Sequence, residues 1–238
     1  LEGTVIGVAQ RERIGERPLE GDVVLHIVAH GVRALELGPA RHAAFVPGEL
    51  RIGPGVRRAL DAHVREGLPC VQREGCDQLR LAREAVEELR VSHPESTPSN
   101  VQARYMSPWK SHQLNLKLGP ICQSAVTLAR YCASQLCGRP IQELNIDFMV
   151  TDCWMAIYDA GDFTRRHHHF PADFGAVCYL EMGPAAAPLV LGGDYAHSPK
   201  VGEMLLFPGL MDHEVPVTEG RRVCVAMNLT KFATMQAT

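Results

Sequence analysis

The stretch YDAGDFTRRHHHFPADFGAVCYLE, residues 158–181, decides the fold. It contains three consecutive histidines between a Gly-Asp turn and an apolar run. Side chains two residues apart in a strand point to the same face, so His167 and His169 can converge while His168 points away. Imidazole is a good ligand for iron, zinc, copper and nickel. The stretch therefore predicts a divalent-metal site on a β-strand.

A third candidate ligand, His213, lies downstream in FPGLMDHEVPV (207–217), after a predicted strand and a Pro-Gly turn. If the two strands are antiparallel neighbours, His213 lies opposite the first pair. A histidine is more often solvated or hydrogen-bonded than metal-bound. The strand context and mutual spacing nevertheless favour one ion on His167, His169 and His213. The remaining histidines lack such a context and are predicted to be structural or surface residues: His26, His30, His42, His63, His93, His112 and His197.

The C-terminal part, from about residue 143 onward, is typical of a strand-rich fold. Short β-rich runs are separated by Gly, Pro and Asp turns. The runs are ELNIDFMVTDCWMAIYD (143–159), FGAVCYLEM (174–182), APLVLGG (187–193), EMLLFPG (203–209) and RRVCVAMNLTKF (221–232). Many short strands and few helices over roughly 95 residues predict a sandwich or a barrel.

The N-terminal part is predicted to be mainly helical. Apolar residues recur at helix spacing in three stretches: GVRRALDAHVREG (55–67), CDQLRLAREAVEELRVSH (76–93) and LGPICQSAVTLARYCASQLCG (118–138). In the third stretch, Pro120 is near the first turn and Gly138 is just past the end. VSHPESTPSN (91–100) is typical of a loop. DVVLHIVAHGVRALEL (22–37) is compatible with a strand, a helix or both in turn.

The composition excludes several classes of protein. With 46% hydrophobic and 21% charged residues among 238, the chain can bury a sizeable core and is not disordered. The net charge of −3 and the absence of Lys/Arg runs argue against a nucleic-acid partner. No apolar stretch is long enough to span a membrane. A small-molecule substrate is expected, and an anionic one is left open because a single Arg in a pocket can bind it.

The cysteines and the N-terminus predict a cytoplasmic protein. None of the eight cysteines forms a C-x-x-C pair, and several lie in apolar runs, such as Cys178 and Cys224. They are expected to be small buried hydrophobic residues in a reducing compartment. The N-terminal segment LEGTVIGVAQRERIGER (1–17) lacks the pattern of a signal peptide.

Two sequence blocks carry a resemblance to a known family. The first has the pattern Y-x-x-G-D-x-x-x-x-H-x-H, with Tyr158, Gly161, Asp162, His167 and His169. The second is VGEMLLFPGLMDHEVPVTEGRRVCVAMNL (201–229), with Gly202, Phe207-Pro208, His213 and a final strand that begins with Arg and ends in Asn228. Over residues 154–232, about a third of the chain, the sequence resembles the non-haem iron(II) and 2-oxoglutarate-dependent oxygenases. It is most similar to their prolyl-hydroxylase-like branch and to related bacterial and phage oxygenases. NVQARYMSPWKSHQLNL (100–116) resembles an upstream Trp-containing segment of the same relatives more weakly.

The resemblance implies a fold and a cofactor site. The fold is α+β: a double-stranded β-helix, a jelly-roll or cupin-like barrel, over residues 141–238, with the mainly helical residues 1–140 packed on it. Arg222 would pair with the distal carboxylate of 2-oxoglutarate, since a guanidinium holds a carboxylate bidentately. Arg221 would point to the opposite face. Arg222 is favoured because it shares its face with Cys224 and Asn228.

The sequence departs from the family pattern at two positions. Most members have Asp or Glu two residues after the first histidine, whereas this chain has His169. Asp173, in the following turn, is the alternative carboxylate ligand. A Ser often lies two residues after the Arg, and here it is Cys224. A thiol is a weak donor, so a hydroxyl of Tyr158 or Tyr179 is expected to help to bind 2-oxoglutarate.

The resemblance implies an oxygenase that uses iron(II), 2-oxoglutarate and O2. It would hydroxylate a C–H bond of a small molecule or an amino-acid-like substrate and release succinate and CO2. The alternative is a three-His cupin without 2-oxoglutarate: a dioxygenase, isomerase or binding protein. The same residues fit its patterns G-x5-H-x-H-x3-D and G-x5-P-x4-H, and a non-catalytic interaction module is a third possibility. Arg222 favours the oxygenase. The N-terminal helices are expected to shape the pocket or a homodimer contact.

Overall fold

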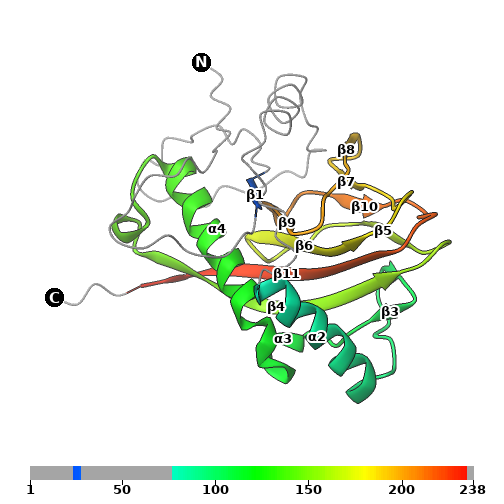
Figure 1. Cartoon of the computed structure of the whole chain (residues 1–238). Coiled ribbons are helices and arrows are strands. Elements are labelled where there is room, and N and C mark those ends of the chain that lie inside the picture. Colours follow the sequence, from blue (N-terminus) through cyan, green and yellow to red (C-terminus); the bar gives the residue numbers. More distant parts are fainter. Residues whose placement is uncertain (1–23, 28–76, 235–238) are drawn as a thin grey trace.

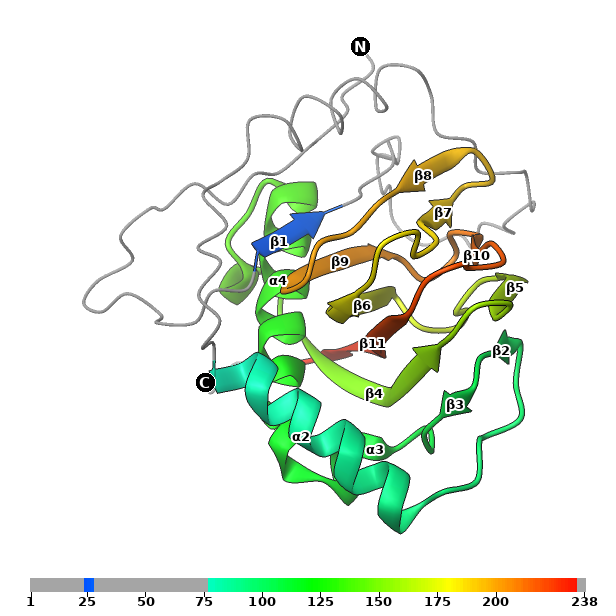
Figure 2. The same cartoon turned by 45° about the vertical axis from the view of Figure 1, so that its right-hand side comes forward.

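Two β-sheets face each other in the computed structural model, which describes residues 24–27 and 77–234. The larger sheet has the strand order β1-β9-β6-β11-β4-β3 and the smaller has β2-β5-β10-β7-β8 (Figures 1 and 2). The larger consists of β1 (Val24–Ile27), β9 (Glu203–Pro208), β6 (Phe174–Met182), β11 (Arg222–Ala233), β4 (Ile146–Tyr158) and β3 (Tyr105–Met106). The smaller consists of β2 (Val101–Gln102), β5 (Phe163–His167), β10 (His213–Val215), β7 (Leu189–Leu191) and β8 (Tyr195–His197). This arrangement confirms the predicted sandwich or barrel.

Both faces of the larger sheet are buried along most of β6 and β9. Because neighbouring side chains alternate between faces, one set points toward the smaller sheet and the other toward the helices. On β6, Val177 and Tyr179 belong to the inner apolar cluster, whereas Ala176 and Cys178 belong to the outer one. The strand is buried without interruption from Phe174 to Leu180. The continuous apolar runs in the sequence follow from this double burial.

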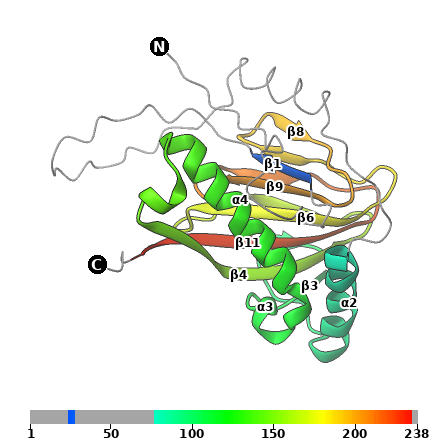
Figure 3. The ribbon, with the colours of Figure 1, turned by 60° about the vertical axis from the view of Figure 1, so that its left-hand side comes forward.

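Two long helices cover the outer face of the larger sheet (Figure 3). They are α2 (Asp77–Ser92) and α4 (Gly119–Cys137), and α3 (Ser111–Leu114) and the 3-10 turns Leu116–Leu118 and Ile141–Glu143 connect to them. Leu79, Ala82, Val86 and Leu89 form the buried stripe of α2, at helix spacing. Gly138 ends α4 in the left-handed conformation with φ 62°, where its N–H caps the helix.

A β-bulge interrupts the pairing of β4 with β11. Asn228 pairs with Asp152, but the next residue on β11 pairs with Val150, so Thr151 is the extra residue. A bulge lets neighbouring residues on one strand point to the same side. Thr151 and Asp152 accordingly both line the pocket described below.

Most of the predicted elements are present in the described residues. The helices predicted at 76–93 and 118–138 and the five predicted strands are confirmed. From 22–37, Val24–Ile27 forms a strand parallel to β9, and its other residues lie outside the described ranges, as does the helix predicted at 55–67. The division of the chain into two parts at residue 140 stays a prediction. β2 and β3 precede this residue, and β2 belongs to the smaller sheet and β3 to the larger. No described helix is long and apolar enough to cross a membrane.

Candidate metal centre

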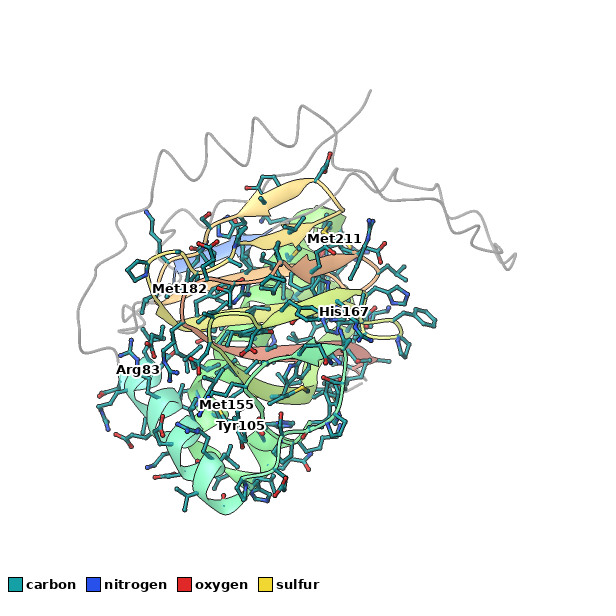
Figure 4. All side chains as sticks on the ribbon, turned by 90° about the vertical axis from the view of Figure 1, so that its right-hand side faces the viewer. Arg83, Tyr105, Met155, His167, Met182 and Met211 are labelled. Atoms are coloured by element: carbon teal, nitrogen blue, oxygen red, sulfur yellow. The ribbon has the colours of Figure 1, made fainter. Side chains whose placement is uncertain are left out.

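Three histidines converge between β5 and β10. His167 is the last residue of β5 and pairs directly with His213, the first residue of β10. His169 lies two residues beyond the end of β5. The candidate ligand atoms of the three side chains all lie within 4.8 Å of one another. Figure 4 shows His167 at the same end of the sandwich as Met211.

His169 reaches the cluster from a turn, not from the strand. Its backbone N–H donates to the carbonyl of Gly209 at 2.7 Å, and its carbonyl accepts from Ala172 at 2.8 Å. A Cβ at Gly209 would lie 1.9 Å from the carbonyl oxygen of Ala172, so the two turns approach as closely as their backbones permit. The prediction that His167 and His169 lie on one strand is therefore wrong, because β5 ends at His167 and His169 lies in the turn that follows.

The histidines are held in the form that binds a metal. The Nδ1 atoms of His167 and His213 lie 2.8 and 3.0 Å from the carbonyl oxygens of Arg165 and Met211. Each Nδ1 can donate to that carbonyl, which leaves Nε2 unprotonated toward the cluster. Burial lowers the pKa of His167 and His213, and lowers that of His169 to about 3. All three imidazoles are therefore neutral near pH 7.

The spacing fits a single ion. Metal–imidazole bonds are about 2 Å long, so two nitrogens on one ion are roughly 3–4 Å apart. The Nε2 atoms of His169 and His213 are 3.1 Å apart. An N3 ligand set of this kind suits iron, zinc, copper or nickel.

Asp173, the alternative carboxylate ligand, is not part of this cluster. Its carboxylate forms an ion pair with the ammonium of Lys231 and accepts the Lys231 backbone N–H at 2.7 Å. Its own backbone N–H donates to Leu229 at 2.9 Å. These contacts hold Asp173 against β11.

The two candidates for the third ligand can be separated by mutation. His169→Ala is expected to weaken iron(II) binding by at least about ten-fold, because a coordinating nitrogen is lost. Asp173→Ala should change it little, since that carboxylate is engaged by Lys231. Competition with a chelator under nitrogen measures both affinities. The reverse order would make Asp173 the ligand, and no effect of either change would remove both from the metal site.

Arg222 lies inside the barrel with no acidic partner in the described part of the chain. It is 1% exposed, and its Nη1 donates to the carbonyls of Ala187 and Pro188 at 3.1 and 3.4 Å. The guanidinium carbon lies 5.5 and 5.1 Å from the ring centres of Tyr158 and Tyr179. Its Nε atom and the hydroxyl of Tyr179 are buried and have no hydrogen-bond partner among the residues that the structure describes.

The surroundings keep Arg222 charged and both tyrosines protonated. Burial by itself lowers the pKa of Arg222, but the neighbouring tyrosines and Cys224 outweigh it and raise that pKa. Burial also raises the pKa of Tyr158 and Tyr179. The hydroxyl of Tyr179 is therefore a donor beside a buried cation.

Arg221 points to the outside, as strand alternation predicts. It is paired with Glu181 at 3.1 Å and with Asp159 at 3.0 Å. Its charge is thus already neutralised at the surface, and only Arg222 is directed into the barrel.

Donor groups inside the barrel are spaced to hold a short dicarboxylate together with the ion. The Tyr158 hydroxyl, beside Arg222, lies 2.7 Å from the hydroxyl of Thr164 on β5. Thr164 and His167 pair with Val215 and His213, which are two residues apart on β10, so β5 is bulged here and the span is roughly 7 Å at about 3.3 Å per residue. This separation is comparable with the length of a five-carbon dicarboxylate. The orphaned Nε of Arg222 and hydroxyl of Tyr179 therefore fit 2-oxoglutarate.

A pocket of about 420 Å³ adjoins the histidines. Its lining includes Asn100, Trp109, Asp152, Phe170 and Asn228. None of these residues was predicted from the sequence to line a substrate site. Asp152 and Asn228 pair with each other across β4 and β11. The alternation of side chains along these strands could have indicated that they share a face.

Comparisons with known proteins support the fold. No family model matches, and no curated protein matches. The epimerase SnoN from nogalamycin biosynthesis, non-haem and α-ketoglutarate dependent, has a TM-score of 0.51 at 15% identity, covering 77% of this chain and 87% of that chain. The related carbocyclase SnoK has a TM-score of 0.50 at 12% identity, covering 70% and 80%. A prolyl-4-hydroxylase from Pseudomonas putida has a TM-score of 0.48 at 21% identity, covering 64% and 85%.

The predicted α+β fold is confirmed. The two facing sheets and the helices on the larger one form a double-stranded β-helix of the jelly-roll kind. Its barrel holds the histidine cluster at one end and the guanidinium of Arg222 in its interior.

Proposed function

We propose that this chain is an iron(II)- and 2-oxoglutarate-dependent oxygenase that hydroxylates a C–H bond of a small molecule or an amino-acid-like substrate. The observation that carries the proposal is Arg222: a fully buried cation without an acidic partner among the described residues, in the same barrel as three converging histidines. The resemblance over residues 154–232 supports it, and so does the fold shared with SnoN and SnoK.

The residues have separate tasks in this proposal. His167, His169 and His213 would hold iron(II) through their ring nitrogens. Arg222 and the hydroxyl of Tyr179 would hold the distal carboxylate of 2-oxoglutarate. When bound, iron and 2-oxoglutarate together supply the activation of O2 for C–H oxidation, with release of succinate and CO2.

Apolar side chains line the interior of the barrel beside these groups. Phe207 lies with its ring centre 4.7 Å from that of His213, and Trp154 lies 5.7 Å from that of His169. Leu189 and Leu191 are buried in the same inner cluster. Burial of Arg222 in this apolar interior strengthens the attraction between its guanidinium and a carboxylate, so it favours cofactor binding.

The cupin alternative leaves Arg222 unexplained. Burying a cation without an anion costs several kcal/mol, so a buried arginine is ordinarily paired. In a protein that binds only a metal on the three histidines, no anion would offset this free-energy cost. A dicarboxylate cofactor would supply the missing anion.

Titration of 2-oxoglutarate into the anaerobic iron-loaded protein tests the function. The expected result is a weak visible absorbance that saturates with cofactor, followed by succinate when air is admitted. Zinc-loaded protein is the control and should produce no such absorbance. A protein that holds its full complement of iron but forms no complex at millimolar 2-oxoglutarate would refute the oxygenase and leave the cupin.

A further inference from the structure

We propose that the pocket beside the histidines accepts a neutral substrate with hydroxyl or amide groups on a compact apolar skeleton. The proposal rests on the proposed function for the pocket's role as a substrate site. It is carried by the charges, aromatic surfaces and unpaired amide atoms of the pocket lining, which are independent of the metal and of 2-oxoglutarate.

The pocket lies where a substrate would meet the metal. His167 and His169 form part of its lining. Figure 4 shows His167 at the end of the sandwich, so the lining reaches the rim of the barrel. The volume of about 420 Å³ is within the range of small-ligand sites, which are roughly 300–1,000 Å³.

Aromatic rings provide the apolar surface. Trp109 is 38% exposed and meets the buried Trp154 edge to face, with ring centres 4.8 Å apart. Phe170 is 68% exposed at the same pocket. Exposed aromatic rings next to a pocket are surfaces on which an apolar skeleton can be buried.

The charges of the lining do not suit an anion. The described lining residues include no Lys or Arg. Asp152 is the one acid among them, and it accepts from Lys110 at 2.8 Å and from Asn228 at 3.2 Å. An anion would find no unpaired cation there apart from the metal, because the nearby Lys110 ammonium is already paired with Asp152. A cation would have to displace Lys110.

Two amide side chains leave polar atoms unpaired. Asn228 donates through Nδ2 to Asp152, and its buried Oδ1 has no donor within residues 24–27 and 77–234. The Nδ2 of Asn100 is also buried and has no acceptor in the described part of the chain. An unsatisfied buried polar atom costs about 1–3 kcal/mol, which a ligand with both donor and acceptor groups can relieve. Hydroxyl and amide groups supply both without a charge.

A probe series with one common skeleton tests the charge and the polar group separately. The probes are cyclohexane-1,2-diol, cyclohexanecarboxamide, cyclohexanecarboxylate and cyclohexylammonium. The chain has two tryptophans, and both line the pocket, so intrinsic fluorescence reports binding directly. Titrations are made under nitrogen with zinc(II) and 2-oxoglutarate, and again without them.

The diol or the carboxamide is expected to bind at least about ten-fold more tightly than the carboxylate and the ammonium compound. The two neutral probes distinguish a hydroxylated substrate from an amide-bearing one. Asn228→Ala should weaken the better neutral probe about ten-fold, equivalent to the 1.4 kcal/mol of one lost hydrogen bond. Gln135→Ala, which removes an exposed amide on α4, is the matched control.

Lys110→Met provides a second variant that does not touch the unpaired amides. It leaves the Asp152 carboxylate without its ammonium partner, so the ammonium probe should gain about ten-fold in affinity. Equal or tighter binding of the carboxylate probe to the wild type overturns the proposal. So does a lack of binding by both neutral probes, or an unchanged affinity in Asn228→Ala. Neutral-probe binding by a protein that forms no 2-oxoglutarate complex would refute the oxygenase and retain the neutral-ligand site.

Discussion

Arg222→Ala is expected to raise the concentration of 2-oxoglutarate that half-saturates the iron-loaded protein by about a hundred-fold or more. Removing one partner of a buried charge pair costs several kcal/mol, and each 1.4 kcal/mol is about ten-fold in affinity. Iron loading should persist, because Arg222 is not one of the three candidate metal ligands. The measurement is the visible absorbance of the complex, titrated under nitrogen, with succinate formation as a second readout.

Arg221→Ala is the matched control for that change. Arg221 is paired with Glu181 and Asp159 at the surface, so its loss should alter the 2-oxoglutarate requirement by much less. Arg222→Lys should fall between the wild type and Arg222→Ala, since an ammonium keeps the charge but not the bidentate geometry. If Arg221→Ala were the damaging change, the assignment of the cofactor to the barrel interior would be wrong.

His213→Ala is expected to reduce the bound metal from about one ion per chain to well below one. His213 is 5% exposed and lies directly opposite His167, so its loss would leave two of the three converging imidazoles to hold the ion. Elemental analysis after anaerobic loading and desalting gives the stoichiometry. A urea unfolding curve recorded by circular dichroism establishes that the variant is folded.

His168→Ala is the neighbouring control for the metal site. His168 is exposed, and its Nδ1 accepts the backbone N–H of Phe170. It is not part of the converging group, so this variant should load as the wild type does. Equal, tight loading of His213→Ala and the wild type would remove His213 from the site.

Much of the fold was predictable because alternation and helix spacing are local properties of the chain. The runs that became β6 and β9 bury both faces, as do residues 153–158 of β4 and 222–227 of β11, and their apolar character identified them. Strand alternation also gave the correct faces of Arg221 and Arg222. The pairing of His167 with His213 followed from the expectation of antiparallel neighbours.

The remaining features depend on contacts that sequence periodicity does not record. His169 joins the cluster through a turn held by Gly209, and a two-residue spacing cannot distinguish that turn from a continued strand. Strands as short as β8 and β10 contain too few residues for a period to be detected. Asn100 and Trp109 enter the pocket from a segment distant in sequence, so their position follows from tertiary packing alone.

The double burial of β6 has a consequence for how its register is specified. In a sheet with one wet face, a shift of one residue exposes the apolar side chains, so the hydrophobic pattern forbids it. From Phe174 to Leu180 such a shift would exchange two apolar sets, and the penalty would be small. The register is instead restricted by steric contact at Gly175. A Cβ at this position would lie 2.6 Å from the ring of Phe207, its partner on β9. A slip in either direction would bring Phe174 or Ala176 to that place, so the missing side chain selects one alignment where hydrophobicity cannot.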